Sequence, residues 1–272
     1  MGFLDGQAGI VTGGAVGLGN NYAKALAKEG CNLAICDVRP EVEQAGKEIA
    51  ETYGVKVLAY VADVSVPADV RRVVDGAVAA FGRIDVLINN AGIHRSSTAT
   101  DNLDKSLEDY EKLVGVNLKG EYMFGRAVIP VMIAGGRGGN IINVGTDHVH
   151  THPGRATLGG GGMDLYDASK WGVTGFTVAW AKALKEHNIR VNAMCMGATD
   201  SNMLRGFNGP NVKPETVATW MKPEQVCDLA IQIIKEGPGG RTGQQIGTWV
   251  GHEIVLQPIP PAKADHLISE GA

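Results

Sequence analysis

Residues 10–26, "IVTGGAVGLGNNYAKAL", decide the fold of this chain. A short β-branched run ends in glycines at Gly13, Gly17 and Gly19, and an amphipathic helical pattern begins directly after them. Such a strand-to-helix turn lets backbone amides approach a pyrophosphate at the N-terminus of the helix. An ordinary turn can look the same, but Asp37 ends the next apolar run, 18 residues past Gly19. The combination predicts a dinucleotide-binding site.

Short apolar runs alternate with longer helical patterns outward from this stretch. Runs such as "NLAICD" and "IDVLINNAG" show no period-2 alternation, which is typical of parallel strands that helices bury on both faces. Helices are expected at about 106–134, 165–187 and 223–235, and further strands at "GNIINVG", "IRVNAMCMG" and "GQQIGTWVG". The sequence therefore predicts an α/β fold, a doubly wound parallel sheet of Rossmann type with about seven strands and helices on both faces.

Composition limits the class of protein. A chain of 272 residues with 44% apolar content can form one domain, and we expect residues 1–272 to be a single dinucleotide-binding catalytic domain. The net charge of -4 and the scattered basic residues argue against a nucleic-acid partner. No signal peptide and no bilayer-spanning apolar run are present, so no membrane partner is expected. The four widely spaced cysteines fit a reducing, cytoplasmic location.

Two long loops interrupt the pattern, at residues 147–164 and 198–222, and the chain ends in a tail at 252–272. Long loops at the carboxyl ends of strands usually bind ligands, so both are expected to be substrate loops. The glycines at 159–162 suggest a hinge for a lid, with a surface insertion as the alternative. The tail is expected either to close a neighbouring subunit's site or to be disordered.

Asp37 bears on the choice of cofactor. A carboxylate there can accept hydrogen bonds from the ribose hydroxyls and would repel a 2′-phosphate, which favours NAD over NADP. Arg39, two residues later, is the one nearby cation that argues the other way. NAD is the predicted cofactor.

Tyr166 and Lys170 form the candidate proton-transfer pair. They are four residues apart in a helical stretch, so their side chains lie on one helix face. An ammonium near a phenol favours the phenolate, so we expect Lys170 to lower the pKa of Tyr166 from its usual value of about 10. Tyr166 would then exchange a proton near neutral pH. An unrelated surface helix could show the same spacing.

Several motifs in this order resemble the short-chain dehydrogenase/reductase family. They are the glycine motif T-G-x-x-x-G-x-G at 12–19, "NNAG" at 89–92, "YDASK" at 166–170 and "RVNAMCMG" at 190–197. The resemblance implies a catalytic set of Asn117, Thr146, Tyr166 and Lys170 and a homotetramer or dimer. It also implies cofactor contacts from Thr12, Gly13, Gly17, Leu18, Gly19, Asp37, Val38, Asp63, Val64, Asn90, Ala91, Gly92, Tyr166, Lys170, Gly197, Thr199 and Ser201.

The chain departs from the family pattern at three places. Thr146 stands where the family has a serine; it keeps the hydroxyl, but its methyl group stiffens χ1. Thr146 also precedes Tyr166 by 20 residues, a longer separation than is usual in the family. Met196 replaces the proline that usually precedes the glycine at Gly197, which removes a constraint on φ.

The substrate is the least determined part of the prediction. His94, Thr146, His148 and Met203 are the expected substrate contacts, and the apolar loop 198–222 favours a cyclic or aromatic secondary alcohol or ketone. His94, Arg95, His148 and Arg155 would equally suit a polyol or an anion, so a sugar or polyol dehydrogenase is the alternative enzyme.

Three interpretations from other classes fit the sequence less well. The first is a metal site, because the alternate positions of His148, His150 and His152 would place three imidazoles on one side of an extended segment. No carboxylate or cysteine completes such a ligand set, so no metal is predicted. A non-catalytic NAD-binding regulator would need a damaged catalytic set. A cofactor-free lyase or dehalogenase would lack the glycine turn and Lys170. The expected activity is an NAD-dependent alcohol dehydrogenase or ketone reductase.

Overall fold

A computed structural model describes residues 2–149, 162–209 and 211–259. Its centre is a seven-stranded parallel sheet in the order β3-β2-β1-β4-β5-β6-β7. The strands are β1 Ala8–Thr12, β2 Asn32–Asp37, β3 Val57–Val61, β4 Val86–Asn89, β5 Gly139–Val144, β6 Ile189–Met196 and β7 Gln245–Thr248. The predicted strand number and the doubly wound architecture are confirmed.

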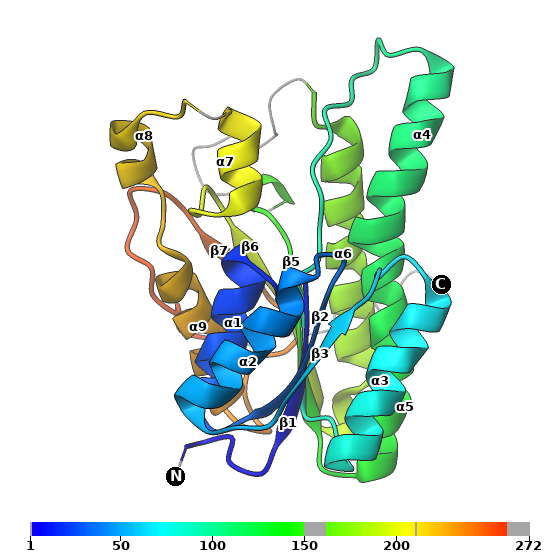
Figure 1. Cartoon of the computed structure of the whole chain (residues 1–272), viewed down its shortest axis with the longest axis vertical. Helices are drawn as coiled ribbons and strands as arrows, with labels where there is room; N and C mark the ends of the chain where they lie inside the picture. The colour runs from blue at the N-terminus through cyan, green and yellow to red at the C-terminus, as the bar shows by residue number, and fades with distance from the viewer. Residues whose placement is uncertain (1, 150–161, 210, 260–272) are drawn as a thin grey trace, which may run out of the picture.

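Helices cover both faces of the sheet (Figure 1). One face is covered by α1 Gly17–Lys28, α2 Glu41–Tyr53 and α9 Pro223–Lys235, in which α1 lies between the other two. The other face is covered by α3 Pro67–Phe81, α4 Leu103–Val114, α5 Glu121–Gly135 and α6 Asp164–Ala183. The short helices α7 Asn202–Asn208 and α8 Pro214–Thr219 lie at the end of the molecule to which the strands point (Figure 1).

The sheet separates two apolar cores. Val11 belongs to the core beneath α1, α2 and α9, and its neighbour Ile10 belongs to the core on the other face. Each is fully buried, as expected when successive side chains of a strand point to opposite faces and helices cover both. This two-sided burial explains why the strand sequences are continuously apolar.

Two expected helices are shorter or less regular than predicted. The stretch 106–134 is not one α-helix, because a π-helical turn, η1 Gly115–Gly120, separates α4 from α5. A Cβ at Gly120 would lie 2.7 Å from Val64 Cγ2, so only a glycine permits this close approach of the turn to the end of β3. The helix expected at 165–187 ends at Ala183, before a short 3₁₀ turn, η3 Lys185–His187.

The loop expected at 198–222 contains two short helices. Ser201 caps α7 by accepting a hydrogen bond from Leu204 N at 3.2 Å, and Pro214 occupies the first turn of α8. In the loop expected at 147–164, a 3₁₀ turn, η2 Asp147–Val149, comes first and α6 begins at Asp164. Residues 150–161, with most of the predicted glycine hinge, and tail residues 260–272 lie outside the described residues.

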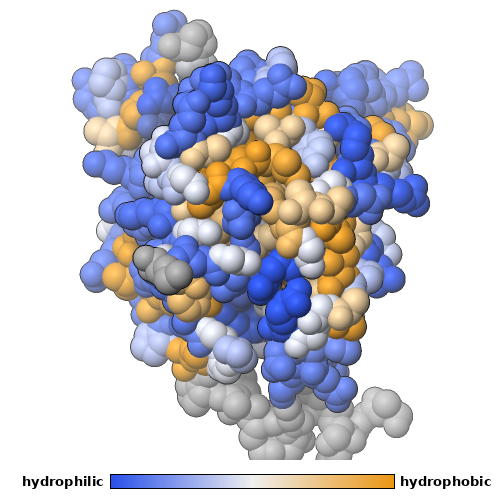
Figure 2. Space-filling model, turned by 60° about the horizontal axis from the view of Figure 1, so that its bottom comes forward, coloured by the Kyte–Doolittle hydropathy of each residue, from blue (hydrophilic) through white to orange (hydrophobic). Residues whose placement is uncertain are grey.

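Figure 2 shows the molecule tilted so that the end opposite α7 and α8 comes toward the reader. Apolar residues form a broad area on this face, bordered by hydrophilic residues. Of the helices in the described residues, none has the length and apolar character needed to cross a bilayer. The predicted site residues lie toward the other end, where the strands finish.

Candidate active site

The predicted site residues gather at the carboxyl edge of the parallel sheet. β1 and β4 are neighbours, but the helices that follow them, α1 and α4, cover opposite faces of the sheet (Figure 1). In open parallel sheets, ligands bind where the strand order reverses in this way. Thr12 and Asp37 end β1 and β2. The segments after the strands contain Gly13, Gly17, Leu18 and Gly19 after β1, Val38 after β2, Asp63 and Val64 after β3, Asn90, Ala91, Gly92 and His94 after β4, Thr146 and His148 after β5, and Gly197, Thr199, Ser201 and Met203 after β6.

Close backbone packing shapes the glycine turn. Gly13 has a φ of 69°, and a Cβ there would lie 2.8 Å from Asn90 Nδ2. A Cβ at Gly19 would lie 2.0 Å from Gly13 O, so the first turn of α1 could not approach β1 with any larger residue. Thr12 Oγ1 accepts hydrogen bonds from Asn90 N at 3.0 Å and Ala91 N at 2.9 Å. The glycine turn is thereby tied to the segment after β4.

The same turn also reaches the segment after β6. A Cβ at Gly17 would lie 3.7 Å from Asn202 Oδ1 and 3.9 Å from Ser201 Cβ. Thr199 Oγ1 donates to Gly197 O at 3.0 Å, which tightens the backbone between β6 and α7. The glycine turn and the start of the segment after β6, both expected to contact the cofactor, therefore lie beside each other.

Asp37 faces the glycine turn. One carboxylate oxygen accepts a hydrogen bond from Ala15 N at 3.1 Å, and the other accepts from Arg39 N at 3.1 Å. These bonds fix the carboxylate at the end of β2, while Val38 is 62% exposed beside it. Asp63, at the end of the neighbouring strand, accepts from Ser65 N at 2.8 Å and Ser65 Oγ at 2.7 Å. A glycine cradle that admits no Cβ and a fixed acid beside it fit a dinucleotide.

Asn117 lies in the π-helical turn, and it is almost fully buried. Its Oδ1 accepts from Ile93 N at 2.8 Å, and its Nδ2 donates to Ile93 O at 2.9 Å and to Ser169 Oγ at 3.3 Å. A Cβ at Gly92 would lie 3.4 Å from Asn117 Oδ1 and 3.8 Å from Lys170 Nζ. Asn117 thus joins the segment after β4 to α6. Irregular π turns within helices are frequent at functional sites.

Lys170 is 4% exposed, and its Nζ donates a hydrogen bond to Val144 O at 2.6 Å. Burial lowers the pKa of Lys170, and the negative charge of the Glu121 carboxylate opposes this shift. Glu121 is 7% exposed, and its Oε1 has no hydrogen-bond partner among the described residues. Burial raises the pKa of Glu121 to about 8, against a smaller opposing effect of Lys170. Both groups are therefore biased toward their neutral forms.

The expected effect on Tyr166 is wrong in sign. Desolvation raises the pKa of Tyr166 to about 12; hydrogen bonding with the Thr146 side chain acts to lower it, and the charges of Asp167 and Asp147 raise it further. The Lys170 side chain donates its hydrogen bond to Val144 O rather than to the phenol. The helical spacing correctly predicts that Tyr166 and Lys170 lie on one helix. It gives no information on the burial of the phenol, which determines the direction of its pKa shift.

Thr146 directly follows β5 and is 5% exposed. Its hydroxyl donates to Asp147 Oδ1 at 3.3 Å and accepts from His148 N at 3.5 Å. A Cβ at Gly197 would lie 2.8 Å from Asp147 Oδ2, so a glycine after β6 leaves room for this carboxylate. Met196 ends β6 and is 7% exposed, so β6 continues through the position of the missing proline.

Two imidazoles flank Tyr166. The His94 ring centroid lies 5.5 Å from that of Tyr166, and the His148 centroid lies 6.2 Å from it. His148 Nδ1 lies 2.7 Å from Asp167 Oδ1. Phe207, on α7, packs edge-on against His94 at 4.8 Å between centroids. The predicted contact Met203 is 39% exposed one turn earlier on the same helix.

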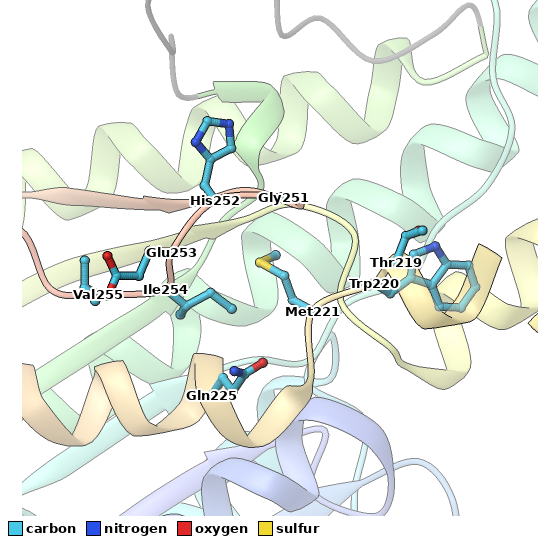
Figure 3. Close-up of a pocket in the computed structure, with 9 residues that line it drawn as sticks. All are labelled: Thr219, Trp220, Met221, Gln225, Gly251, His252, Glu253, Ile254 and Val255. Carbon is cyan, nitrogen blue, oxygen red and sulfur yellow. The ribbon is translucent and has the colours of Figure 1, made fainter. Parts of the chain in front are cut away.

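A pocket outside this cluster is lined by the segment after α8 and the segment after β7. Figure 3 shows its lining residues, with Met221 and Ile254 facing each other above Gln225 of α9. None of the predicted site residues lines it. In the described part of the chain, no three His, Cys, Asp or Glu side chains are placed to hold a metal ion. His150 and His152 lie outside the described residues.

Sequence reasoning missed Glu121 and Asp167. Asp167 directly follows Tyr166, so the sequence shows that it lies near the site. Its contact with His148 depends on how α6 packs against the segment after β5, which the sequence does not show. Glu121 is four residues after Asn117, a spacing that could have indicated a shared helix face. No sequence signal indicates that Phe207 contacts His94.

Known proteins resemble the chain over most of its length. The family model described as "short chain dehydrogenase" matches residues 7–210. The 3-oxoacyl-[acyl-carrier-protein] reductase FabG of Thermotoga maritima is 34% identical over 251 residues, which cover 90% of this chain and 96% of that protein. A Mycobacterium tuberculosis protein named an uncharacterized NAD-dependent oxidoreductase is 30% identical over 275 residues, covering 90% of this chain and 95% of that one.

Among solved structures, a short chain dehydrogenase from Burkholderia cenocepacia in complex with NADP superposes with a TM-score of 0.76 at 30% identity. The match covers 90% of this chain and 96% of that one. The parallel sheet with helices on both faces agrees with this likeness. The chain is an oxidoreductase of the short-chain dehydrogenase/reductase family.

Proposed function

We propose that the chain is an NAD-dependent alcohol dehydrogenase or ketone reductase that acts on a secondary CH–OH group. The observation that supports this most is the convergence of Thr146, Tyr166 and Lys170 at the edge that also bears the glycine turn. Bound NAD would supply the hydride acceptor. The side chains would then need only to orient the reacting oxygen and move its proton.

Tyr166 would exchange the proton of the alcohol, and Thr146 would orient the reacting oxygen. Thr146 suits this role because its hydroxyl is a donor and an acceptor, and its hydrogen bonding already acts on the phenol of Tyr166. Lys170 would hold the nicotinamide ribose and stabilise the phenolate. Asn117 would support a water path from Lys170, since Gly92 leaves space between Asn117 Oδ1 and Lys170 Nζ.

The cofactor contacts would come from the segments after β1 to β6 that the sequence indicated. Backbone amides of the glycine turn would meet the pyrophosphate. The Asp37 carboxylate would accept hydrogen bonds from the ribose hydroxyls, and its charge supports NAD over NADP. The relatives do not decide between the two cofactors, because the Mycobacterium tuberculosis relative is named an NAD-dependent oxidoreductase and the Burkholderia cenocepacia structure is a complex with NADP. The choice between NAD and NADP therefore rests on Asp37 and Arg39.

The substrate is proposed to be a cyclic or aromatic secondary alcohol or its ketone. Phe207 and Met203 supply apolar surface from α7 near His94. The alternatives are a sugar or polyol dehydrogenase, which the two histidines favour, and a non-catalytic NAD-binding regulator. The regulator would bind NAD tightly without turning over any alcohol.

The test is reduction of NAD or NADP with a panel of cyclic, aryl, steroidal and sugar alcohols. We expect turnover with NAD and with one class of alcohol. Tyr166→Phe should lower kcat by at least about 10²-fold, with NAD binding retained. Tyr110→Phe is the matched control, because Tyr110 is an exposed tyrosine on α4. Comparable turnover by Tyr166→Phe would refute the mechanism.

Association into a homotetramer or dimer is part of the proposal. Tyr122, Phe176 and Trp180 form an aromatic cluster on α5 and α6, with Phe176 and Trp180 stacked at 5.2 Å. Trp171 and Val178 on α6 are each about half exposed, at 49% and 50%. Exposed apolar surface of this kind suits a contact with a second copy. Val178→Asp should lower the mass in analytical ultracentrifugation; an unchanged mass would exclude this face as the contact.

A cytoplasmic location is also proposed. Cys31, Cys36, Cys195 and Cys227 are all buried and unpaired. Unpaired thiols are typical of proteins in a reducing compartment.

A further inference from the structure

We propose that His94 and His148 form a subsite for a second, uncharged oxygen of the substrate, next to the carbon that reacts at Tyr166. The natural substrate class would then be a vicinal diol, oxidised to an α-hydroxy ketone, or the reverse. This inference rests on the proposed reaction at Tyr166 and specifies its substrate. A simple secondary alcohol would fill the site but leave the subsite without a partner.

The position of the two imidazoles supports the subsite. Their ring centroids lie 5.5 Å and 6.2 Å from that of Tyr166, from the segments after β4 and β5. Each ring therefore lies close to a substrate carbon that reacts at Tyr166, which favours an oxygen attached next to that carbon over a distant hydroxyl on a long chain.

His94 has a polar atom that needs a partner. Its Nε2 is buried and forms no hydrogen bond with any described residue. An unsatisfied buried polar atom is unfavourable, and such atoms in native proteins commonly meet a ligand or water. Phe207 packs edge-on against the His94 ring at 4.8 Å and so restricts how it can turn. A substrate oxygen that meets Nε2 would satisfy this atom.

His148 is oriented by Asp167. Because its Nδ1 lies 2.7 Å from the carboxylate Oδ1, the pair fixes the plane of the ring. In the neutral imidazole, Nδ1 then donates to Asp167 and Nε2 is left as an acceptor. Asp167 is therefore a positioning residue, which prepares His148 to accept a hydrogen bond from a substrate hydroxyl.

The charges around the two rings favour an uncharged oxygen over a carboxylate. Asp167 and Asp147 both lie on the His148 side, with Asp147 Oδ1 3.9 Å from His148 Nε2. Burial lowers the pKa of His94, so it is neutral at pH 7 and offers no positive charge. Arg95, the nearby cation in the sequence, is paired with Asp109 and Glu108. An anionic group would meet repulsion rather than a counter-ion.

The experiment compares two substrates that differ by one hydroxyl, cyclohexanol and 1,2-cyclohexanediol, in NAD reduction. We expect kcat/KM for the diol to exceed that for cyclohexanol by about 10- to 100-fold. His148→Ala should remove about tenfold of this preference by lowering the kcat/KM of the diol more than that of cyclohexanol. His94→Ala should act in the same way. Asp167→Asn should raise KM for the diol with a smaller effect on cyclohexanol.

The control variant is His187→Ala, since His187 is an exposed histidine in η3, at the opposite end of the sheet. It should leave both substrates unchanged. His148→Gln keeps a hydrogen-bonding side chain and should restore part of the preference. NAD binding to each variant, followed by fluorescence, confirms that the site is folded.

The outcomes separate this inference from the function on which it rests. No turnover of either alcohol, with NAD still bound, would reject the proposed dehydrogenase. Equal turnover of both alcohols, unaltered by His148→Ala and His94→Ala, would keep the dehydrogenase and reject the subsite. Faster turnover of a 2-hydroxy acid than of the diol would also overturn it, because the second oxygen would then be anionic.

Discussion

Replacing Glu121 with glutamine tests the buried carboxyl behind Lys170. The side chain is 7% exposed, and burial raises its pKa from 4.5 to about 8 despite the opposing ammonium of Lys170. Unfolding returns this carboxyl to water and to its ordinary pKa. Between the two values the folded protein therefore holds one proton that the unfolded chain has released.

The direction of the pH dependence follows from this difference. The stability that the protonated carboxyl contributes is fully present below pH 4.5 and is lost as the pH rises toward about 8. A fully ionising group loses on the order of 1 kcal/mol per pH unit in such a window, and the lowered pKa of Lys170 acts in the opposite direction. Glutamine has no proton to lose. The Glu121→Gln protein should therefore gain stability relative to the wild type as the pH rises.

Urea unfolding followed by tryptophan fluorescence, at pH values from 5 to 8, measures the effect. The difference in unfolding free energy between Glu121→Gln and the wild type should increase with pH, by on the order of 1 kcal/mol per pH unit at most. Glu43→Gln is the matched control, because Glu43 is an exposed glutamate on α2, and its difference should stay flat. Parallel pH profiles for Glu121→Gln and the wild type would refute the assignment of a protonated buried carboxyl.

Three further substitutions test the hydrogen bonds and the close packing that support the site. Thr12→Val should lower the unfolding free energy by about 2 kcal/mol in urea titrations, because Asn90 N and Ala91 N lose their acceptor, and Thr12→Ser should restore most of it. Gly19→Ala should weaken NAD binding in fluorescence titrations by at least about tenfold, since the new Cβ would lie 2.0 Å from Gly13 O; unchanged binding would contradict the close approach. Arg190→Met should lower the unfolding free energy by about 3 kcal/mol in the same urea titrations, because the guanidinium of this 4% exposed residue donates to three backbone carbonyls. A decrease of less than about 1 kcal/mol would show that these carbonyls find other hydrogen-bond donors.

The sheet and the positions of the site residues could be predicted because local patterns determine them. Buried parallel strands are continuously apolar, and their carboxyl ends share one edge, so Asp37 and Thr146 were placed by the strands that precede them. The spacing of Tyr166 and Lys170 placed both on α6. The π turn around Asn117 could not be predicted, since it depends on contacts such as that of Gly120 with Val64.

The errors concern charge rather than position. The sequence has no means of showing that the Tyr166 phenol is desolvated, or that Lys170 donates to Val144 O. Glu121 stands in the run "GEYMFG", where a glutamate resembles a solvent-exposed helix residue. Only tertiary packing removes these groups from water, and removal from water determines their pKa values.

The protonation of Glu121 matters for Tyr166 through the lysine that they share as a neighbour. A Tyr166 phenolate in a desolvated site needs a positive charge nearby, and Lys170 is the cation on the same helix face. Burial favours the neutral form of Glu121 and of Lys170, and the charge of each group opposes the shift of the other. Removal of the Glu121 charge would therefore lower the pKa of Lys170 further. Glu121→Gln is thus expected to weaken the support that the proposed mechanism takes from the Lys170 ammonium for a Tyr166 phenolate.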